Sequence, residues 1–415
     1  MSTLASPLAV SEATSLPPRR SLLKLLIFVF LVMQVAFCWT GRGRSMHGDV
    51  DLRAFYAAGA MVRDGQRGLL YDSKAERELQ QQLFHGEGRD LPFLYPAFAA
   101  LPFAVLSACP YPTAFGLMFV LNLGCLFASA VLLRRQANLS WSSGWMFAGF
   151  LAFFPTIMAL MQGQISGALL LCLTGFYVLV QKEHHFYAGL CLSAMLVKFQ
   201  IALPLCLLYL VWRHYRLVAG FAIGATTLAG LSFGIAGRVG TLAYVARLRG
   251  VGMTMSAHPE VARSLFGMQA SAEPNLHGLL TTLGAQGMAG AAWTALASLA
   301  VLLWVSRQKP GVAVAVPAAM LMSYHMQPYD LVLLLLPLAL LLLNPSQPEN
   351  DGDRLGKWVG RASVLTLVAP VAPYLLVTEE TVWLVLPVAA CAWLAGQREA
   401  LTNAPMPLPS LLVLQ

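Results

Sequence analysis

Two aspartates, Asp49 and Asp51, follow directly on the first long apolar run of the chain. A carboxylate in this position suits a general base, the group that takes a proton from an attacking hydroxyl. Aspartate is also a favoured residue at the start of a helix, so Asp51 has the alternative interpretation of a helix cap. Capping and catalysis can coexist, and a helix N-terminus would also lower the pKa of the carboxylate.

Lys198 is enclosed between two apolar half-runs, Ala188–Val197 and Ile201–Trp212. A charge there is costly unless it is paired or faces a polar cavity. A cation facing a cavity can absorb the charge that develops on a leaving phosphate group. The alternative is a lysine that extends its ammonium group to the lipid headgroups.

His325 stands at the end of another apolar run, before Tyr329 and Asp330. An ordinary aspartate, with a pKa of ~3.9, is a weak base for an alcohol. A nearby histidine that relays or orients the proton would therefore help. The alternatives are an interfacial histidine bonded to the backbone, and an Asp330 that only caps its helix.

The elements that position these residues are apolar helices. Hydrophobic residues make up 58% of the 415-residue chain and charged residues only 11%, against about 25% charged in soluble domains. The runs are continuous rather than alternating, which predicts an α-helical bundle in a membrane and excludes a β-barrel. Counting the runs gives about twelve transmembrane helices, with the stretch 95–161 the hardest to assign.

Basic residues predict which side each loop faces. Arg19 and Arg20 place the N-terminus in the cytoplasm, because short cytoplasmic loops carry the excess of arginine and lysine. The predicted organisation is a cytoplasmic tail over 1–21, one transmembrane domain over 22–396 and a cytoplasmic tail over 397–415. It includes external loops over 41–94 and 237–277, and the first of these is expected to carry amphipathic helices on the membrane surface.

Polar breaks between the apolar runs all fall on the external side in this topology, and their convergence predicts a site there. The five breaks are Asp49–Asp51, Gln162–Gln164, Lys198–Gln200, Asn275–His277 and His325–Asp330. The seven cysteines include no Cys-x-x-Cys pair, which argues against a disulfide framework or a zinc site. The net charge of +8 is spread over short loops and indicates contact with anionic membrane lipids rather than nucleic acid.

Several of these residues belong to short sequence segments that follow one another in a defined order along the chain. The pieces are Asp51-Leu52-Arg53-Ala54-Phe55-Tyr56-Ala57-Ala58-Gly59, Gly65 with Leu70-Tyr71-Asp72, Leu94-Tyr95-Pro96, Gly163-Gln164, Ala188-Gly189 leading to Lys198, Asn275-Leu276-His277-Gly278, and His325 with Tyr329-Asp330-Leu331. Together they resemble family 87 of the glycosyltransferases, over most of 22–343. Ala97 and Phe199 stand where this family commonly has proline.

The resemblance implies a multi-span enzyme of the C-type glycosyltransferase fold that moves a hexose, most simply mannose, from a polyprenyl-phosphate carrier. It implies transfer with inversion to a lipid or glycan acceptor on the outer face of the cytoplasmic membrane. It places the base at Asp51, with Asp49 the alternative, and makes His325 its partner. The candidate contacts to the donor phosphate or sugar are Lys198, Gln164, Asn275 and Arg53. Tyr56 and Tyr95 could pack on the sugar or the polyprenyl chain, with an aromatic belt at the membrane interface as the alternative.

No cofactor or metal is expected, because a lipid-monophosphate donor does not need the metal that an Asp-x-Asp pair holds in soluble nucleotide-sugar enzymes. The alternatives are transfer of another carrier-linked sugar, such as arabinofuranose or glucose, and a flippase or transporter without enzymatic activity. Transporters tend to place charges at mid-membrane and to show repeated halves, and neither feature is found in the sequence. The sequence carries no signal for an oligomeric state.

Overall fold

The computed structural model describes residues 19–86, 88–139, 141–257, 269–343, 368–371 and 380–401, and every element in them is helical. The α-helices are α1 (Arg19–Met46), α2 (Leu52–Arg63), α3 (Ser73–Leu83), α4 (Leu101–Leu106), α5 (Tyr111–Gln136), α6 (Ser143–Ala152), α7 (Phe154–Met161), α8 (Ser166–Gln181), α9 (His185–Ser193), α10 (Phe199–Val211), α11 (Tyr215–Ala257), α13 (Leu276–Thr282), α14 (Gly287–Ser306), α15 (Val312–Met322), α16 (Leu335–Leu343) and α19 (Val385–Leu401). Short 3-10 helices join them: η1 (Arg67–Leu69), η2 (Ala97–Ala100), η3 (Ala194–Lys198), η4 (Ala270–Ala272), η5 (Pro328–Leu334), η6 (Ala369–Val371) and η7 (Val382–Leu384).

Five of the described helices are long and apolar enough to cross a membrane: Ser21–Met46, Tyr111–Gln136, His185–Val211, Tyr215–Gly252 and Gly287–Ser306. The pair α6 and α7 makes a sixth if counted as one span, although it bends by 73° before Pro155. Five shorter apolar helices, of 10–17 residues, complete the bundle. The predicted count of twelve is not confirmed. Most of the predicted span Val359–Val377, and most of both predicted tails, lie outside the described residues.

The first external loop differs from its prediction. Leu52, Phe55 and Tyr56 were expected on the apolar face of a helix at the membrane surface. Instead, α2 is buried along almost its whole length, from Leu52 to Met61. The helix packs against α4, and Gly59 allows the approach, since a side chain there would collide with the backbone of Phe103. The expectation of a surface helix is therefore wrong for α2, whereas α3 exposes most of its residues.

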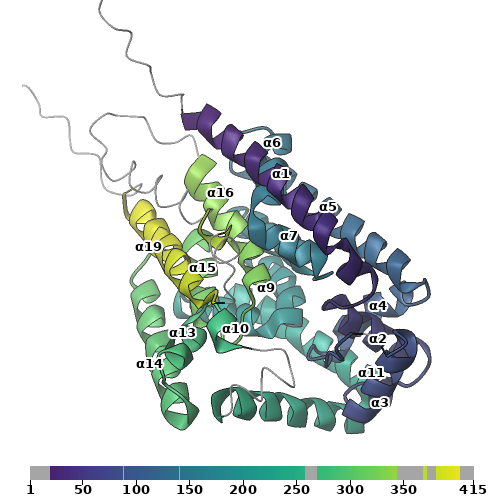
Figure 1. Ribbon diagram of the computed structural model, residues 1–415. Helices are drawn as coiled ribbons and strands as arrows, with labels where there is room; N and C mark the ends of the chain where they lie inside the picture. Colours follow the sequence, from purple (N-terminus) through teal and green to yellow (C-terminus); the bar gives the residue numbers. More distant parts are fainter. Residues whose placement is uncertain are drawn as a thin grey trace, which may run out of the picture.

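The second external loop, expected from Gly237 to His277, begins as a helix. Gly237, which follows the apolar run expected over Leu217–Ala236, adopts a left-handed φ of 65° and kinks α11 there, although the apolar helix continues to Gly252. The chain then continues as helix to Ala257, and this second half of α11 crosses the lower edge of the view in Figure 1. Arg247 ties it to α3 by an ion pair with Glu76, with 2.7 Å between Nη1 and Oε2. The same guanidinium donates to the backbone oxygen of Tyr71 at 2.8 Å.

Helices α9 and α11 pack with their backbones almost in contact. Gly189 on α9 faces the backbone of Leu217, and Gly220 on α11 faces the backbone of Phe186. A Cβ atom at either glycine would overlap a carbonyl oxygen. Small residues that let two membrane helices approach closely give each pair more van der Waals contact.

Substituting Gly189 with alanine is expected to lower the free energy of unfolding by about 1–3 kcal/mol, the usual cost of overpacking. Gly230 on α11 is the matched control, because nothing lies within 4 Å of an added Cβ there. Thermal unfolding of the detergent-solubilised variants measures both effects. Equal melting temperatures for Gly189→Ala and Gly230→Ala would show that the close approach of α9 and α11 does not contribute to stability.

Candidate active site

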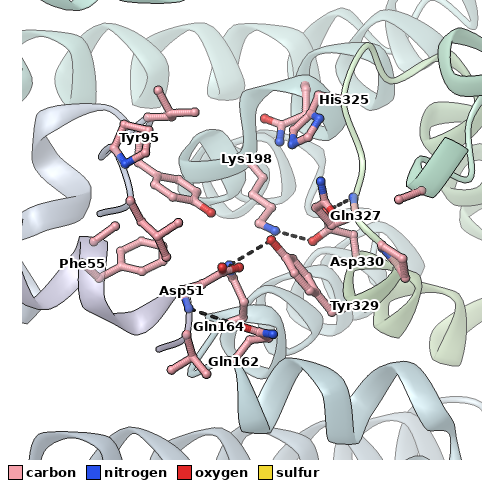
Figure 2. Close-up of a pocket in the computed structure, with 18 of the residues that line it drawn as sticks. Asp51, Phe55, Tyr95, Gln162, Gln164, Lys198, His325, Gln327, Tyr329 and Asp330 are labelled. Carbon is pink, nitrogen blue, oxygen red and sulfur yellow. Dashed lines mark hydrogen bonds and ion pairs between the residues drawn. The ribbon is translucent and has the colours of Figure 1, made fainter. Parts of the chain in front are cut away.

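A cavity of about 960 Å³ opens among the ends of several helices. Its walls come from the residues before α2, the end of α7, the turn η3 and the segment that leads into η5, and Figure 2 shows their side chains converging. Four of the five predicted polar breaks line it, from Asp49–Asp51, Gln162–Gln164, Lys198–Gln200 and His325–Asp330. The fifth break, Asn275–His277, does not line the cavity. The structure therefore brings together most of the polar groups that the sequence placed on one face.

Asp51 is held by the turn after α7. Its backbone N–H donates to Gln162 Oε1 at 3.1 Å, and the backbone N–H of Leu52 donates to the carbonyl of Gln162 at 3.0 Å. Gly163 makes this turn with a φ of +64°, and a Cβ there would lie 2.6 Å from Leu52 Cβ. The pair Gly163-Gln164 is thus a local requirement for seating the start of α2 against α7.

The carboxylate of Asp51 does not cap α2, in contrast to the alternative drawn from the sequence. It accepts a hydrogen bond from Gln164 Nε2 at 2.5 Å, and Gln164 Nε2 also lies 3.0 Å from the Tyr329 hydroxyl. Burial raises the pKa of Asp51, and the opposing effects of Gln164, Tyr329 and Lys198 do not cancel the increase. A carboxylate with a raised pKa is a stronger base than one in water.

Lys198 lies at the end of η3, the irregular turn between α9 and α10. The predicted break in the helix is thus present, and it faces the cavity. The ammonium group forms an ion pair with Asp330, and both side chains are 2% exposed. It also lies 4.7 Å from the centre of the Tyr329 ring. Lys198 is therefore neutralised by a carboxylate, a partner that the sequence interpretation had not assigned to it.

Asp330 has two roles in the structure. Its Oδ2 accepts from the backbone N–H of Gln327 at 3.0 Å, which confirms the predicted cap. Its Oδ1 faces Lys198. One residue thus fixes both the start of η5 and the position of the buried ammonium group.

His325 does not hydrogen-bond to Asp51, the partner that the resemblance implied. Its Nδ1 lies 2.6 Å from Oε1 of Glu273, a residue that the sequence interpretation missed. Glu273 is fully buried, and His277 lies 3.5 Å from its other oxygen. Glu273 lies in the segment before α13, and this segment places its carboxylate on His325 in the position that the resemblance implied for Asp51.

Four other predicted site residues lie outside the cavity lining or at its edge. Tyr56 donates to the backbone oxygen of Cys109 at 2.8 Å, away from the cavity. Arg53 is completely buried against the Phe84 ring and Gln80. Asn275 caps α13 by accepting from Gly278 N at 2.7 Å. Asp49 does line the cavity, but it is partly exposed and pairs with Arg44 at 3.0 Å.

Tyr95 does line the cavity, with its ring 4.4 Å from that of Phe55. Gln162, Tyr329 and Glu273 are the functional candidates that the sequence interpretation left without a role. The signal for Gln162 was its place in the Gln-Gly-Gln break. Glu273 gave a weaker signal, as an isolated acid before a proline near Asn275. Within the described part of the chain, no three His, Cys, Asp or Glu residues group as metal ligands.

Long apolar helices around a polar cavity define a membrane protein that crosses the bilayer several times and carries a site of enzymatic character. The sequence profile of glycosyltransferase family 87 matches residues 93–337, more than half of the chain. The chain belongs to this family and is a membrane glycosyltransferase. The match includes Gln164, Lys198 and His325, whereas Asp51 precedes it. No curated protein and no solved structure matches the chain.

Proposed function

We propose that the protein transfers a hexose, most simply mannose, from a polyprenyl-phosphate carrier to a lipid or glycan acceptor on the extracytoplasmic face. The observation that carries the proposal is the position of Asp51. Its carboxylate lies in the cavity wall and accepts a hydrogen bond from Gln164, which also donates to the Tyr329 hydroxyl. Burial raises the pKa of this carboxylate. The cavity volume of about 960 Å³ is at the upper end for small-molecule sites, which leaves room for a sugar and part of an acceptor.

The proposed reaction is a single displacement with inversion at the anomeric carbon. Asp51 removes the proton from the acceptor hydroxyl as its oxygen forms the new bond to the anomeric carbon. The bond from that carbon to the phosphate oxygen breaks, and polyprenyl phosphate leaves with the electron pair. The negative charge on the leaving phosphate is stabilised by the cationic side of the site, where Lys198 is the proposed contact.

For Lys198 to reach the phosphate, the donor must share it with Asp330. An ammonium group has three donor hydrogens, so one can remain on Asp330 while another binds a phosphate oxygen. We therefore keep Lys198 as the proposed phosphate contact and add Asp330, which orients the ammonium group and neutralises part of its charge. Arg44 and Arg89 also line the cavity and carry positive charge.

The decisive experiment incubates the purified protein with radiolabelled polyprenyl-phosphate-mannose and a panel of lipid and glycan acceptors, with and without a chelator. Transfer with inverted stereochemistry, unaffected by the chelator, is expected. Transfer only from another carrier-linked sugar would keep the class and correct the sugar. Movement of the lipid across vesicle membranes without any transfer would replace the proposal with a flippase.

The pH dependence of transfer is expected to report on Asp51. Burial raises the pKa of this carboxylate, so the base becomes protonated at a higher pH than an ordinary aspartate as the solution is acidified. The donor is a phosphodiester and does not titrate near neutral pH. We therefore expect kcat/KM to fall on the acidic side at a pH above the usual aspartate range, and to keep this fall in Asp49→Asn. A rate that stays constant on acidification to the ordinary aspartate pKa would contradict Asp51 as base.

A further inference from the structure

Glu273 and His325 form a pair that the proposed reaction does not yet use. Glu273 is fully buried, and its Oε1 lies 2.6 Å from Nδ1 of His325. Among the described residues, only histidines, His325 and His277, lie within ion-pair distance of it. A buried carboxylate without a cation is costly. A proton on His325 would compensate this charge.

The two histidines differ in what they face. His277 is almost completely buried on α13, with its ring 4.3 Å from that of Tyr324. His325 lines the cavity, where Figure 2 shows it on the same side as Lys198. With Nδ1 engaged by Glu273, the other ring nitrogen, Nε2, is the one available to a ligand in the cavity. No bond to Nε2 is found within the described part of the chain.

The charges around His325 favour its protonated form. Glu273 contacts it directly, Asp330 adds a second negative charge, and Lys198 opposes them, itself neutralised by Asp330. Burial lowers the pKa of His325, but Glu273 and Asp330 outweigh this effect and the net pKa is raised. Correspondingly, burial raises the pKa of Glu273, and the two histidines reverse the shift to a lowered pKa.

We infer that Glu273 is a positioning residue that holds His325 as an imidazolium, and that Nε2–H of His325 supplies a second cationic donor to the phosphate of the lipid carrier. This role deepens the proposed function and rests on it, since it needs a phosphate-linked donor. It replaces the implied pairing of His325 with Asp51. The leaving phosphate then meets two cations, Lys198 from one helix break and His325 from another.

Binding of polyprenyl phosphate itself tests the inference without turnover. Affinity for the purified protein is measured from pH 6 to pH 9 for wild type, Glu273→Gln and His325→Gln. His325→Gln is expected to weaken binding about 10- to 100-fold at pH 7, the usual loss for a hydrogen bond to a charged group. The phosphate monoester has its own ionisation near pH ~6, and this part of the pH dependence remains in every variant.

Glu273→Gln gives the distinguishing result. Without the carboxylate the histidine loses its proton at a lower pH, so the variant is expected to weaken at a lower pH than wild type, with a deficit that grows from the acidic end of the range. Glu273→Gln with the pH dependence of wild type, or with the constant deficit of His325→Gln, would overturn the inference. The matched controls Glu78→Gln and His184→Gln change exposed side chains of the same types and are expected to bind as wild type.

A third variant keeps the inference testable if Glu273→Gln does not fold. His325→Lys carries a permanent charge over this range, so its affinity should lack the loss that wild type shows at alkaline pH. A wild type that does not bind polyprenyl phosphate at any pH would also overturn the inference. The proposed function is decided separately by the transfer assay. Binding of polyprenyl phosphate without sugar transfer would support the phosphate site and contradict the proposed reaction. Sugar transfer by wild type, together with a wild-type pH dependence of binding in Glu273→Gln, would support the reaction and contradict the role of Glu273.

Discussion

Asp51→Asn is expected to lower kcat for sugar transfer by about 10²- to 10⁴-fold, the usual contribution of a general base. Asparagine has the size of aspartate but cannot take a proton from the acceptor hydroxyl. The KM for the donor should change little, because the proton transfer occurs in the transition state rather than in donor binding. Initial rates at saturating donor and acceptor measure the effect.

The structure provides a control for this variant two residues away. Asp49 is partly exposed and already pairs with Arg44, so Asp49→Asn should change the rate by no more than about twofold. Thermal unfolding separates loss of the base from loss of the fold. Burial disfavours the charged form of Asp51, so Asp51→Asn should unfold at the same temperature as wild type or higher. An inactive Asp49→Asn beside an active Asp51→Asn would transfer the role of base to Asp49.

Lys198→Met is expected to lower the free energy of unfolding by about 3–5 kcal/mol and to abolish transfer. The methionine fills much of the same space but leaves Asp330 as a buried charge without its cation, and breaking one side of a buried ion pair has this cost. Denaturation in detergent measures the stability, and the radiolabelled donor measures the activity. The single variant alone does not distinguish a phosphate contact from a structural ion pair.

The double variant Lys198→Met/Asp330→Asn makes this distinction. Removing both charges together is often neutral for stability, so most of the lost free energy of unfolding should return. Transfer should stay absent, because no ammonium group remains to meet the leaving phosphate. If the double variant recovers transfer along with its stability, Lys198 has only a structural role and the proposed phosphate contact is wrong.

The sequence predicted the parts of the site that depend on the order of apolar and polar segments. Each of Asp51, Gln164, Lys198 and His325 stands where an apolar run stops, and all four line one cavity. Helix ends converge on a common face whenever the spans are packed side by side. Because the apolar helices must lie side by side across the bilayer, the location of the site could be predicted from the sequence without knowledge of how the helices are arranged.

The pairing of side chains was not readable in the same way. Lys198 and Asp330 are 132 residues apart, and His325 and Glu273 are 52 apart. Which carboxylate meets which cation depends on the rotation and tilt of each helix, and the apolar pattern leaves these open. For the same reason the pattern of α2 did not distinguish a helix at the membrane surface from one buried by its neighbours, where even Arg53 finds Gln80 and Asp90.

The turn η5 places Tyr329 and Asp330 next to each other in the chain, with Tyr329 beside Gln164 and Asp330 on Lys198. Two adjacent residues of η5 therefore contact both parts of the site, the surroundings of Asp51 and the ammonium group of Lys198. A shift of Asp330 would therefore also move the Tyr329 hydroxyl, which lies beside the Gln164 amide that donates to Asp51. In this geometry, a movement of η5 would change the contacts of Lys198 and those around Asp51 together, so the two sides of the cavity are mechanically coupled.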